Sequence, residues 1–370
     1  MRPVTASGPV RIGIVGAGTM GSAHARNILE GKIPRLRLTA LCDGHSSHVP
    51  PAPGVKIFEN SRLLIRSGEV DAVLVATPHY SHTSIGIDAL EHGLHLLVEK
   101  PISVHKRDCE KLIAAHHGRE GQVFAAMFNQ RTDPFYQKIR SLIHDGELGE
   151  IRRVHWTITN WFRTAAYYGS GGWRATWAGE GGGVLVNQCP HNLDLLQWLF
   201  GMPARIRAFC QFGRYHDIEV EDNVTAYLEF PNAATAVFIA STGEAPGSNR
   251  LEIAAERGKL VYENDTLTFT RNEVEMSAFS RASDKPFAAP ATTEITFPIS
   301  GHGEQHAGIL KNFAAAILDG APLIAPAAEG IHSVELANAM LYSTFTAKTI
   351  ALPLNARSYE RHLKKLIASP

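Results

Sequence analysis

The chain has 370 residues, of which 44% are hydrophobic and 19% charged, a composition typical of a globular protein large enough for two domains. Thirty-six basic residues balance 36 acidic ones, so the net charge gives no reason to expect a nucleic-acid or membrane-surface partner. The N-terminus lacks the apolar stretch of a signal peptide, no run approaches the ~18 apolar residues of a membrane span, and the four cysteines are far apart, so we expect a cytoplasmic protein with free thiols.

Strands and helices alternate over roughly the first 125 residues. Short apolar segments predict strands at 10–15, 36–43, 55–58, 70–78, 94–101 and 122–128. Helical patterns follow the first strand as far as Leu29, lie near 63–68, and cover 81–93 with Ser81 as the expected N-cap. This alternation predicts right-handed crossovers and a parallel, doubly wound sheet.

The pattern changes after about residue 150, where apolar and polar residues alternate. Strands are predicted within 151–162, 205–213, 223–242, 249–271 and 292–298, and helices at 133–146, 191–201, 305–320 and 328–349. The result would be a mainly antiparallel sheet with helices on one face. The other face would then need cover, and we expect subunit pairing there, in a homodimer or homotetramer.

A G-x-G-x-x-G array, formed by Gly16, Gly18 and Gly21, lies between the first strand and its helix. In that context the first glycine allows a tight turn, the second lets the backbone approach a pyrophosphate, and the third lets the helix pack closely. The helix N-terminus would bind the phosphates, so Thr19 and Met20 are also candidate cofactor contacts. Three glycines alone would be equally consistent with a tight turn.

Asp43 ends the second predicted strand, where an acid accepts hydrogen bonds from ribose hydroxyls and repels a 2′-phosphate. The next residues, Gly44, His45 and Ser46, supply no cation for an extra phosphate. We therefore predict NAD, with NADP the less favoured cofactor. The alternative for Asp43 is a turn-capping carboxylate.

Two further strands end in polar motifs that would face the same edge of the sheet. The first motif supplies Thr77, Pro78, His79 and His82, and the second Glu99 and Lys100, all candidate cofactor contacts. Lys100 could also stabilise alkoxide charge on a substrate oxygen, although most lysines are simply surface residues. The H-x-x-H pairs at 79–82 and 45–48 lack the four-ligand spacing of zinc sites, and we expect no metal.

Three consecutive glycines, 181–183, precede Asn187 and His191. Residues four apart share one face of a helical turn, and a histidine can take a hydroxyl proton near neutral pH. We therefore expect Lys100, His191 and Asn187 to form the catalytic set. A buried, hydrogen-bonded histidine is the alternative, and Asp194 could either orient the site or stabilise its helix.

These motifs together resemble the Gfo/Idh/MocA family, which includes glucose–fructose oxidoreductase and inositol dehydrogenase. The resemblance is carried by the glycine loop, "ATPHYSH" (76–82), "EKPIS" (99–103), "WRATWAGEGGGVLVNQCPHNLDLLQWLFG" (173–201) and "HAGILKNFAAAILDGAP" (306–322). It implies an α/β protein: an N-terminal Rossmann domain (1–128) and a C-terminal α/β domain (129–370) with a large, mostly antiparallel, open-faced sheet. It also implies a frequently cis Lys–Pro bond and an active site between the domains.

The resemblance also places further residues near the nicotinamide or the substrate. Asn129 and Arg131 match a family position near the nicotinamide, and Trp173–Arg174 a pair common near the ring or substrate. The aromatic segment 160–177, with Tyr168, could hold a sugar, or it could be only a packed loop between domains. We take Arg131, Tyr168, Trp173, Arg174, Asn187 and His191 as candidate substrate contacts. Inositol dehydrogenase-like members carry Asp where Asn187 stands, which leaves the substrate open.

The sequence therefore predicts an NAD(P)-dependent oxidoreductase acting on a secondary alcohol of a sugar, glycoside or polyol. One alternative is an NAD-dependent glycosidase that works by oxidation and elimination, which would release aglycone without net NADH. A second is a non-catalytic, NAD-binding regulator of sugar metabolism. The presence of Lys100 and His191 argues against this alternative, because a regulator needs no catalytic residues.

Overall fold

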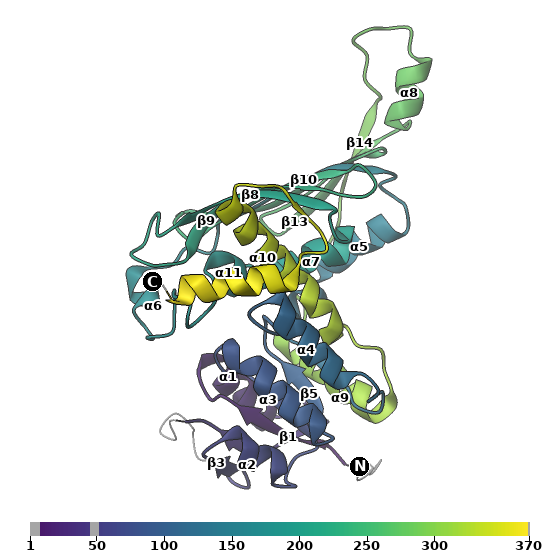
Figure 1. Ribbon diagram of the computed structural model, residues 1–370. Helices are drawn as coiled ribbons and strands as arrows, with labels where there is room; N and C mark the ends of the chain where they lie inside the picture. Colours follow the sequence, from purple (N-terminus) through teal and green to yellow (C-terminus); the bar gives the residue numbers. More distant parts are fainter. Residues whose placement is uncertain (1–7, 45–51, 369–370) are drawn as a thin grey trace.

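The computed structural model describes residues 8–44 and 52–368. Its N-terminal part, drawn in purple to blue in Figure 1, contains a parallel sheet. This sheet has six strands in the order β3-β2-β1-β4-β5-β6. The strands are β1 (Val10–Val15), β2 (Leu36–Cys42), β3 (Lys56–Phe58), β4 (Ala72–Val75), β5 (His95–Val98) and β6 (Phe124–Ala126). The predicted doubly wound sheet is confirmed. Its strand order reverses between β1 and β4, which is where such sheets bind ligands.

Helices α1 (Thr19–Leu29), α2 (Ser61–Arg66), α3 (Tyr80–Glu91) and α4 (Lys106–His116) connect these strands. Two details differ from the sequence analysis. The expected Ser81 cap is wrong, because α3 begins at Tyr80 after His79 and has no side-chain cap. Helix α4 was also not predicted, because its segment is mostly polar and buries only a narrow stripe that includes Cys109 and Leu112.

Helix α9 (Gln305–Asp319) returns from the C-terminal half to pack on the parallel sheet. Ile309, Leu310 and Phe313 belong to the same apolar core as β1, β4 and β5. The segment that follows α9 also joins this sheet, since the Ala126 amide donates to the Ala325 carbonyl at 3.0 Å. The first structural unit therefore includes a piece of chain far beyond residue 129.

The second sheet has nine strands in the order β14-β13-β12-β11-β7-β10-β9-β8-β15. They are β7 (Ile151–Ile158), β8 (Arg205–Phe212), β9 (Glu221–Glu229), β10 (Thr235–Ser241), β11 (Asn249–Ala255), β12 (Gly258–Glu263), β13 (Thr266–Asn272), β14 (Thr292–Thr296) and β15 (Ile350–Ala351). Every neighbouring pair is antiparallel except β7 and β10. The predicted large, mostly antiparallel sheet is thus confirmed.

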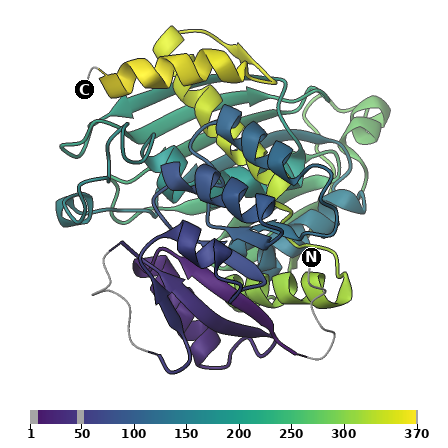
Figure 2. The same ribbon diagram turned by 60° about the horizontal axis from the view of Figure 1, so that its bottom comes forward.

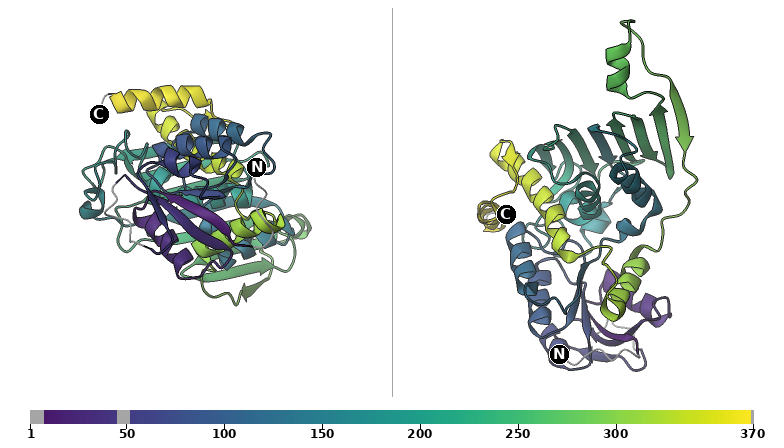
Figure 3. Two further views of the ribbon diagram at one scale, coloured as in Figure 1. Left: turned by 90° about the horizontal axis from the view of Figure 1, so that it is seen from below. Right: turned by 90° about the vertical axis from the view of Figure 1, so that its right-hand side faces the viewer.

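The helices of the C-terminal half lie on one face of this sheet, as Figures 2 and 3 show for the long helix α10. These helices are α5 (Pro134–His144), α6 (Ala165–Tyr168), α7 (Pro190–Phe200), α8 (Met276–Ala282), α10 (Gly330–Thr346) and α11 (Ala356–Ala368). Only α8 stands apart, on an arm that projects beyond β13 and β14 (Figure 3). The opposite face carries Phe209, 59% exposed, and Tyr227, 43% exposed.

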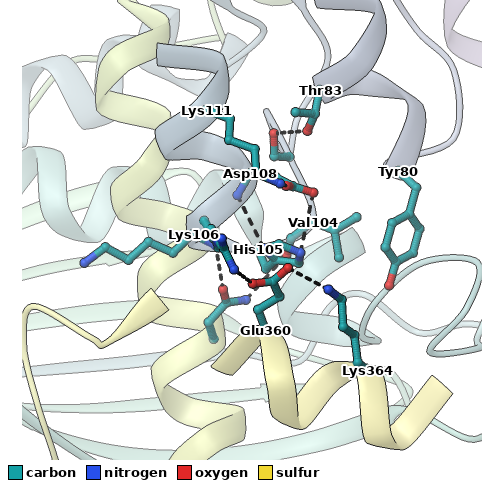
Figure 4. Close-up of polar contacts among 12 residues, drawn as sticks. Tyr80, Thr83, Val104, His105, Lys106, Asp108, Lys111, Glu360 and Lys364 are labelled. Carbon is teal, nitrogen blue, oxygen red and sulfur yellow. Dashed lines mark hydrogen bonds and ion pairs between the residues drawn. The ribbon is translucent and has the colours of Figure 1, made fainter. Parts of the chain in front are cut away.

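The start of α4 is anchored to the C-terminal half. Lys106 is buried, and its Nζ donates to Glu335 Oε1 at 2.8 Å and to the Leu354 carbonyl at 3.0 Å. Figure 4 shows Glu360 of α11 beside this helix start, with Lys364 donating to it at 2.9 Å. Helix α11 was not predicted from the sequence. These contacts fix the segment that follows Lys100, because it runs directly into α4.

Candidate functional site

In the glycine loop between β1 and α1, two glycines have no room for a Cβ atom and the third has open space beside it. Gly16 has a φ of +96°, and a Cβ there would lie 2.6 Å from the Ala76 carbonyl oxygen. A Cβ on Gly21 would lie 1.8 Å from the Gly16 oxygen. A Cβ on Gly18 would meet no described atom within 4 Å. The loop therefore keeps open the position where a phosphate-binding turn needs backbone access.

The N-terminus of α1 suits an anion. Gly18 is its N-cap and offers no side-chain cap, and the first turn, from Thr19 and Met20 onward, contains no acidic residue. Helix N-termini carry unpaired N–H groups and positive dipole, which phosphates satisfy. Across the loop, the buried Thr77 Oγ1 has no hydrogen-bond partner among the described residues. These residues fit a dinucleotide pyrophosphate.

Asp43 follows β2 and reaches the glycine loop. Its Oδ2 accepts a hydrogen bond from the Ala17 amide at 2.6 Å. The carboxylate therefore lies at the edge of the loop, where the ribose of a dinucleotide is held in this type of fold. His45, Ser46 and His48 lie outside the described residues.

Glu99 and the two predicted loop histidines are buried and already hydrogen-bonded. Glu99 Oε1 lies 2.6 Å from His24 Nε2. Burial raises the pKa of Glu99, but the hydrogen bond from His24 and the nearby charges, including Lys100, together outweigh it and bring the pKa to about 2. His82 bonds the carbonyls of Thr77 and Pro101, at 2.7 and 2.8 Å.

His79 Nδ1 lies 3.2 Å from the Glu180 carbonyl. Burial lowers the pKa of His79 to about 3, so its imidazole is neutral. Burial also lowers the pKa of His82, while its contacts with the two carbonyl oxygens act in the opposite direction. Their hydrogen bonds hold together the loops after β4 and β5. Among the described residues we found no group of three or more His, Cys, Asp or Glu side chains that could hold a metal.

Lys100 and His191 come together from different halves of the chain. The Lys100–Pro101 peptide is cis, as the resemblance implied, and Lys100 Nζ donates to the Asn187 carbonyl at 2.8 Å. His191 is 8% exposed, and its buried Nδ1 has no hydrogen-bond partner among the described residues. Burial and the nearby Lys100 charge hold the pKa of His191 well below 6.5, while burial lowers the pKa of Lys100. His191 is therefore a neutral imidazole with a free ring nitrogen.

Asn187 and His191 do not share one helical turn, so that expectation is wrong. Asn187 lies in a short π-helical segment (Val184–Gln188), and His191 lies in the first turn of α7. The Asn187 amide donates to Glu180 and, at 3.2 Å, to the Tyr167 hydroxyl, while its carbonyl accepts from Lys100. Its side chain is thus oriented by Glu180, which was not selected from the sequence, and by Tyr167 of the aromatic segment.

Two buried acids, Glu180 and Glu221, support this segment and were missed. Glu221 of β9 accepts from the Gly183 amide at 2.8 Å and the Leu185 amide at 3.0 Å. Burial raises the pKa of Glu221 to about 7 and also raises that of Glu180. Glu180 adjoins the glycine run, which was a usable signal. Glu221 lies far away in the sequence, so nothing local indicated its role.

The aromatic segment contacts the site from one side. Trp173 packs edge-on against His79, with ring centroids 5.7 Å apart. Arg174 donates to the Tyr167 hydroxyl at 3.0 Å, and the Tyr168 hydroxyl lies 2.9 Å from Thr242 Oγ1. Tyr167, one of the aromatic residues of segment 160–177, connects Arg174 to Asn187.

Arg131, expected near the nicotinamide, is buried and paired with carboxylates. It is 1% exposed, and its guanidinium donates to both oxygens of Asp194, at 2.8 and 2.6 Å, and to Glu329 at 2.6 Å. The structure therefore contradicts Arg131 as a substrate contact, because its donors are occupied by carboxylates, and it gives Asp194 a structural role. Asn129 donates to Gln305 at 2.6 Å but keeps a buried Oδ1 with no partner in the described chain.

Comparison with known proteins gives the same picture for both halves. Residues 10–127 match the model of an oxidoreductase family with an NAD-binding Rossmann fold, and residues 136–261 match the GFO/IDH/MocA C-terminal domain. Inositol 2-dehydrogenase 2 of Paenarthrobacter aurescens is 25% identical over 90% of this chain and 96% of its own. The rhizopine catabolism protein MocA of Rhizobium meliloti is 31% identical over 53% of this chain and 59% of its own.

Solved structures share the fold over nearly the full length. The WlbA dehydrogenase of Chromobacterium violaceum, crystallised with NADH and UDP-GlcNAcA, has a TM-score of 0.82 at 23% identity, covering 96% of this chain and 99% of its own. Levoglucosan dehydrogenase with NADH and levoglucosan has a TM-score of 0.77 at 20% identity, covering 93% and 100%. The two matched domains, their order and the open glycine loop lead to one conclusion: the chain belongs to the Gfo/Idh/MocA family of NAD-binding oxidoreductases.

Proposed function

We propose that this protein is a dehydrogenase that oxidises a secondary alcohol of a sugar, glycoside or polyol. The observation that carries the proposal is the proximity of a neutral His191, with a free ring nitrogen, and the partly buried Lys100 ammonium just after β5. Relatives named for inositol and structures named for levoglucosan support a polyhydroxylated substrate.

His191 is suited to accept the hydroxyl proton, because its imidazole is neutral at neutral pH and its Nδ1 is unpartnered. Lys100 would donate a hydrogen bond to the same oxygen and stabilise the developing negative charge. A bound NAD would supply the hydride acceptor. Asn187, held by Glu180 and Tyr167, would fix a neighbouring hydroxyl group.

The cofactor would bind along the β1–α1 loop. The open backbone at Gly18 and the α1 N-terminus would hold the pyrophosphate, and Asp43 would accept hydrogen bonds from the adenosine ribose. We therefore propose NAD in preference to NADP, since a carboxylate at Asp43 would repel a 2′-phosphate. Thr77 Oγ1 and Asn129 Oδ1 are buried acceptors that a cofactor can satisfy.

A substrate panel tests the proposal. Aldoses, inositols, anhydrosugars and glycosides are each mixed with the protein and NAD or NADP, and the NADH absorbance is followed. We expect net reduction of NAD with at least one of them and slower reaction with NADP. Release of aglycone without net NADH would instead identify a glycosidase, and no reaction with any compound would favour a regulator.

A further inference from the structure

A large polar pocket lies beside the candidate site. It has a volume of about 570 Å³, within the range of ~300–1,000 Å³ usual for small-molecule sites. Side chains from several separate parts of the chain line it, among them Gln130, Asp133, Asn249, Asp265, His302 and Gln305. The mechanism proposed above uses none of these groups.

The pocket begins next to residues of the candidate site. Gln130 adjoins Asn129, and Gln305 accepts a hydrogen bond from the Asn129 amide at 2.6 Å. The next residue, His306, packs against His24 with ring centroids 5.5 Å apart and lies close enough to His191 to lower its pKa. A molecule held near His191 could therefore extend into this pocket.

The pocket carries negative charge from two separate elements. Asp133, which is 4% exposed, caps α5 and lies 2.9 Å from His302 Nδ1. The other ring nitrogen of His302 lies 3.6 Å from Asp265, in the turn between β12 and β13. The lining residues include no lysine or arginine. Asp133 raises the pKa of His302, and a protonated His302 would offset one of the two carboxylates. An anionic group placed here would still face the second carboxylate, which is costly.

The remaining polar groups suit hydroxyls. Several lining residues carry side-chain amide groups. The buried Gln130 Oε1 has no hydrogen-bond partner in the described part of the chain. A sugar hydroxyl can donate to such an acceptor and accept from a neighbouring amide or imidazole. Leaving a buried acceptor unpaired costs stability, so a ligand that pairs it gains affinity.

We propose that this pocket is a second sugar subsite, which holds a hydroxyl-rich ring without negative charge. The inference rests on the proposed function, since the reacting ring would lie at Lys100 and His191 while the attached ring lies against Asp265 and His302. The substrate class is then a neutral or amino disaccharide or glycoside. Phosphorylated sugars and nucleotide sugars would be disfavoured.

Binding of sugars to the full-length protein with NADH tests this without requiring turnover. The probes are glucose, glucosamine, cellobiose, maltose, the chitosan dimer, cellobiose 6-phosphate and UDP-glucose, measured by calorimetry. We expect at least one neutral or amino disaccharide to bind about tenfold tighter than its monosaccharide. Cellobiose 6-phosphate and UDP-glucose should show no such gain.

The variants Asp265→Asn and His302→Asn should reduce this gain to about threefold or less and leave NADH binding unchanged. Asp284→Asn removes the same charge from the exposed arm and should keep the gain. The proposal is overturned if no disaccharide outbinds its monosaccharide, or if UDP-glucose binds most tightly. A disaccharide gain without NADH formation would refute only the proposed function, and turnover of monosaccharides without a disaccharide gain would refute only the subsite.

Discussion

The two sheets contribute to the site in different ways. The parallel sheet supplies residues directly where its strands end, with Thr77 after β4 and Lys100 after β5. The antiparallel sheet instead supports a connection between β7 and β8, and that connection carries Asn187 and His191. One half of the site is thus positioned by local geometry, and the other by distant side chains such as Glu221.

The largest expected effect tests whether both halves meet on one alcohol. Lys100→Ala and His191→Ala should each lower kcat by about 10²- to 10⁴-fold, because each removes a group acting on the same proton and oxygen. NADH affinity, measured by fluorescence titration, should change little. Lys111→Ala and His144→Ala, at exposed positions, serve as matched controls. A decrease in kcat no larger than that of the controls would contradict the proposed roles of Lys100 and His191.

The next effect tests the connection between the halves. Arg131→Met leaves Asp194 buried without its partner and should lower the free energy of unfolding by about 3–5 kcal/mol in urea titrations. The double variant with Asp194→Leu should recover part of this loss. If Arg131→Met is stable but has a strongly raised KM, Arg131 contacts the substrate after all.

Glu221 gives a pH-dependent test of the antiparallel half. Its folded pKa of about 7 lies above the ordinary 4.5, so its protonated form stabilises the fold at low pH, and this stabilisation is lost as the pH rises through 7. Glu221→Gln removes this titration. As the pH rises from 4.5 to 8, the free energy of unfolding of wild type should therefore fall relative to that of Glu221→Gln by up to about 3 kcal/mol.

Thermal and urea unfolding at several pH values would measure this difference. Glu294→Gln, at an exposed position of β14, is the control and should follow wild type at every pH. Parallel stability curves for Glu221→Gln and wild type would show that Glu221 does not bind its proton as the structure indicates.

A pair of glycine variants tests the parallel half. Gly21→Ala places a Cβ 1.8 Å from the Gly16 oxygen and should cost about 1–3 kcal/mol of stability or more. Gly18→Ala meets no described atom within 4 Å, so its stability should stay within about 0.5 kcal/mol of wild type while its NADH affinity falls. Equal NADH affinity in Gly18→Ala and wild type would place the pyrophosphate elsewhere.

The smallest effect on stability concerns the uncovered face of the antiparallel sheet, where we expect subunit pairing. Phe209, 59% exposed, lies on this face. Phe209→Glu should leave the folded chain intact, because little core packing is lost, but should reduce the mass seen by light scattering to that of a monomer. A wild-type protein that is already monomeric would refute the expected pairing.

The sequence by itself determined the two-domain fold and which candidate site residues follow the parallel strands. The reason is that strand periodicity, a glycine array and the residues at strand ends are local features, and a parallel sheet brings such ends to one edge. Helices α4 and α11 were not predicted, because each has only a narrow apolar stripe in a largely polar segment.

Only the tertiary structure decided which polar residues remain available to a ligand. Arg131 was expected to donate to the substrate, but its guanidinium donates to Asp194 and Glu329, which lie far along the chain. Glu221 and Lys106 carried no local signal, because their partners come from elements that only folding brings near. Long-range packing sets burial, and burial decides whether a charged group is paired, neutral or free to act.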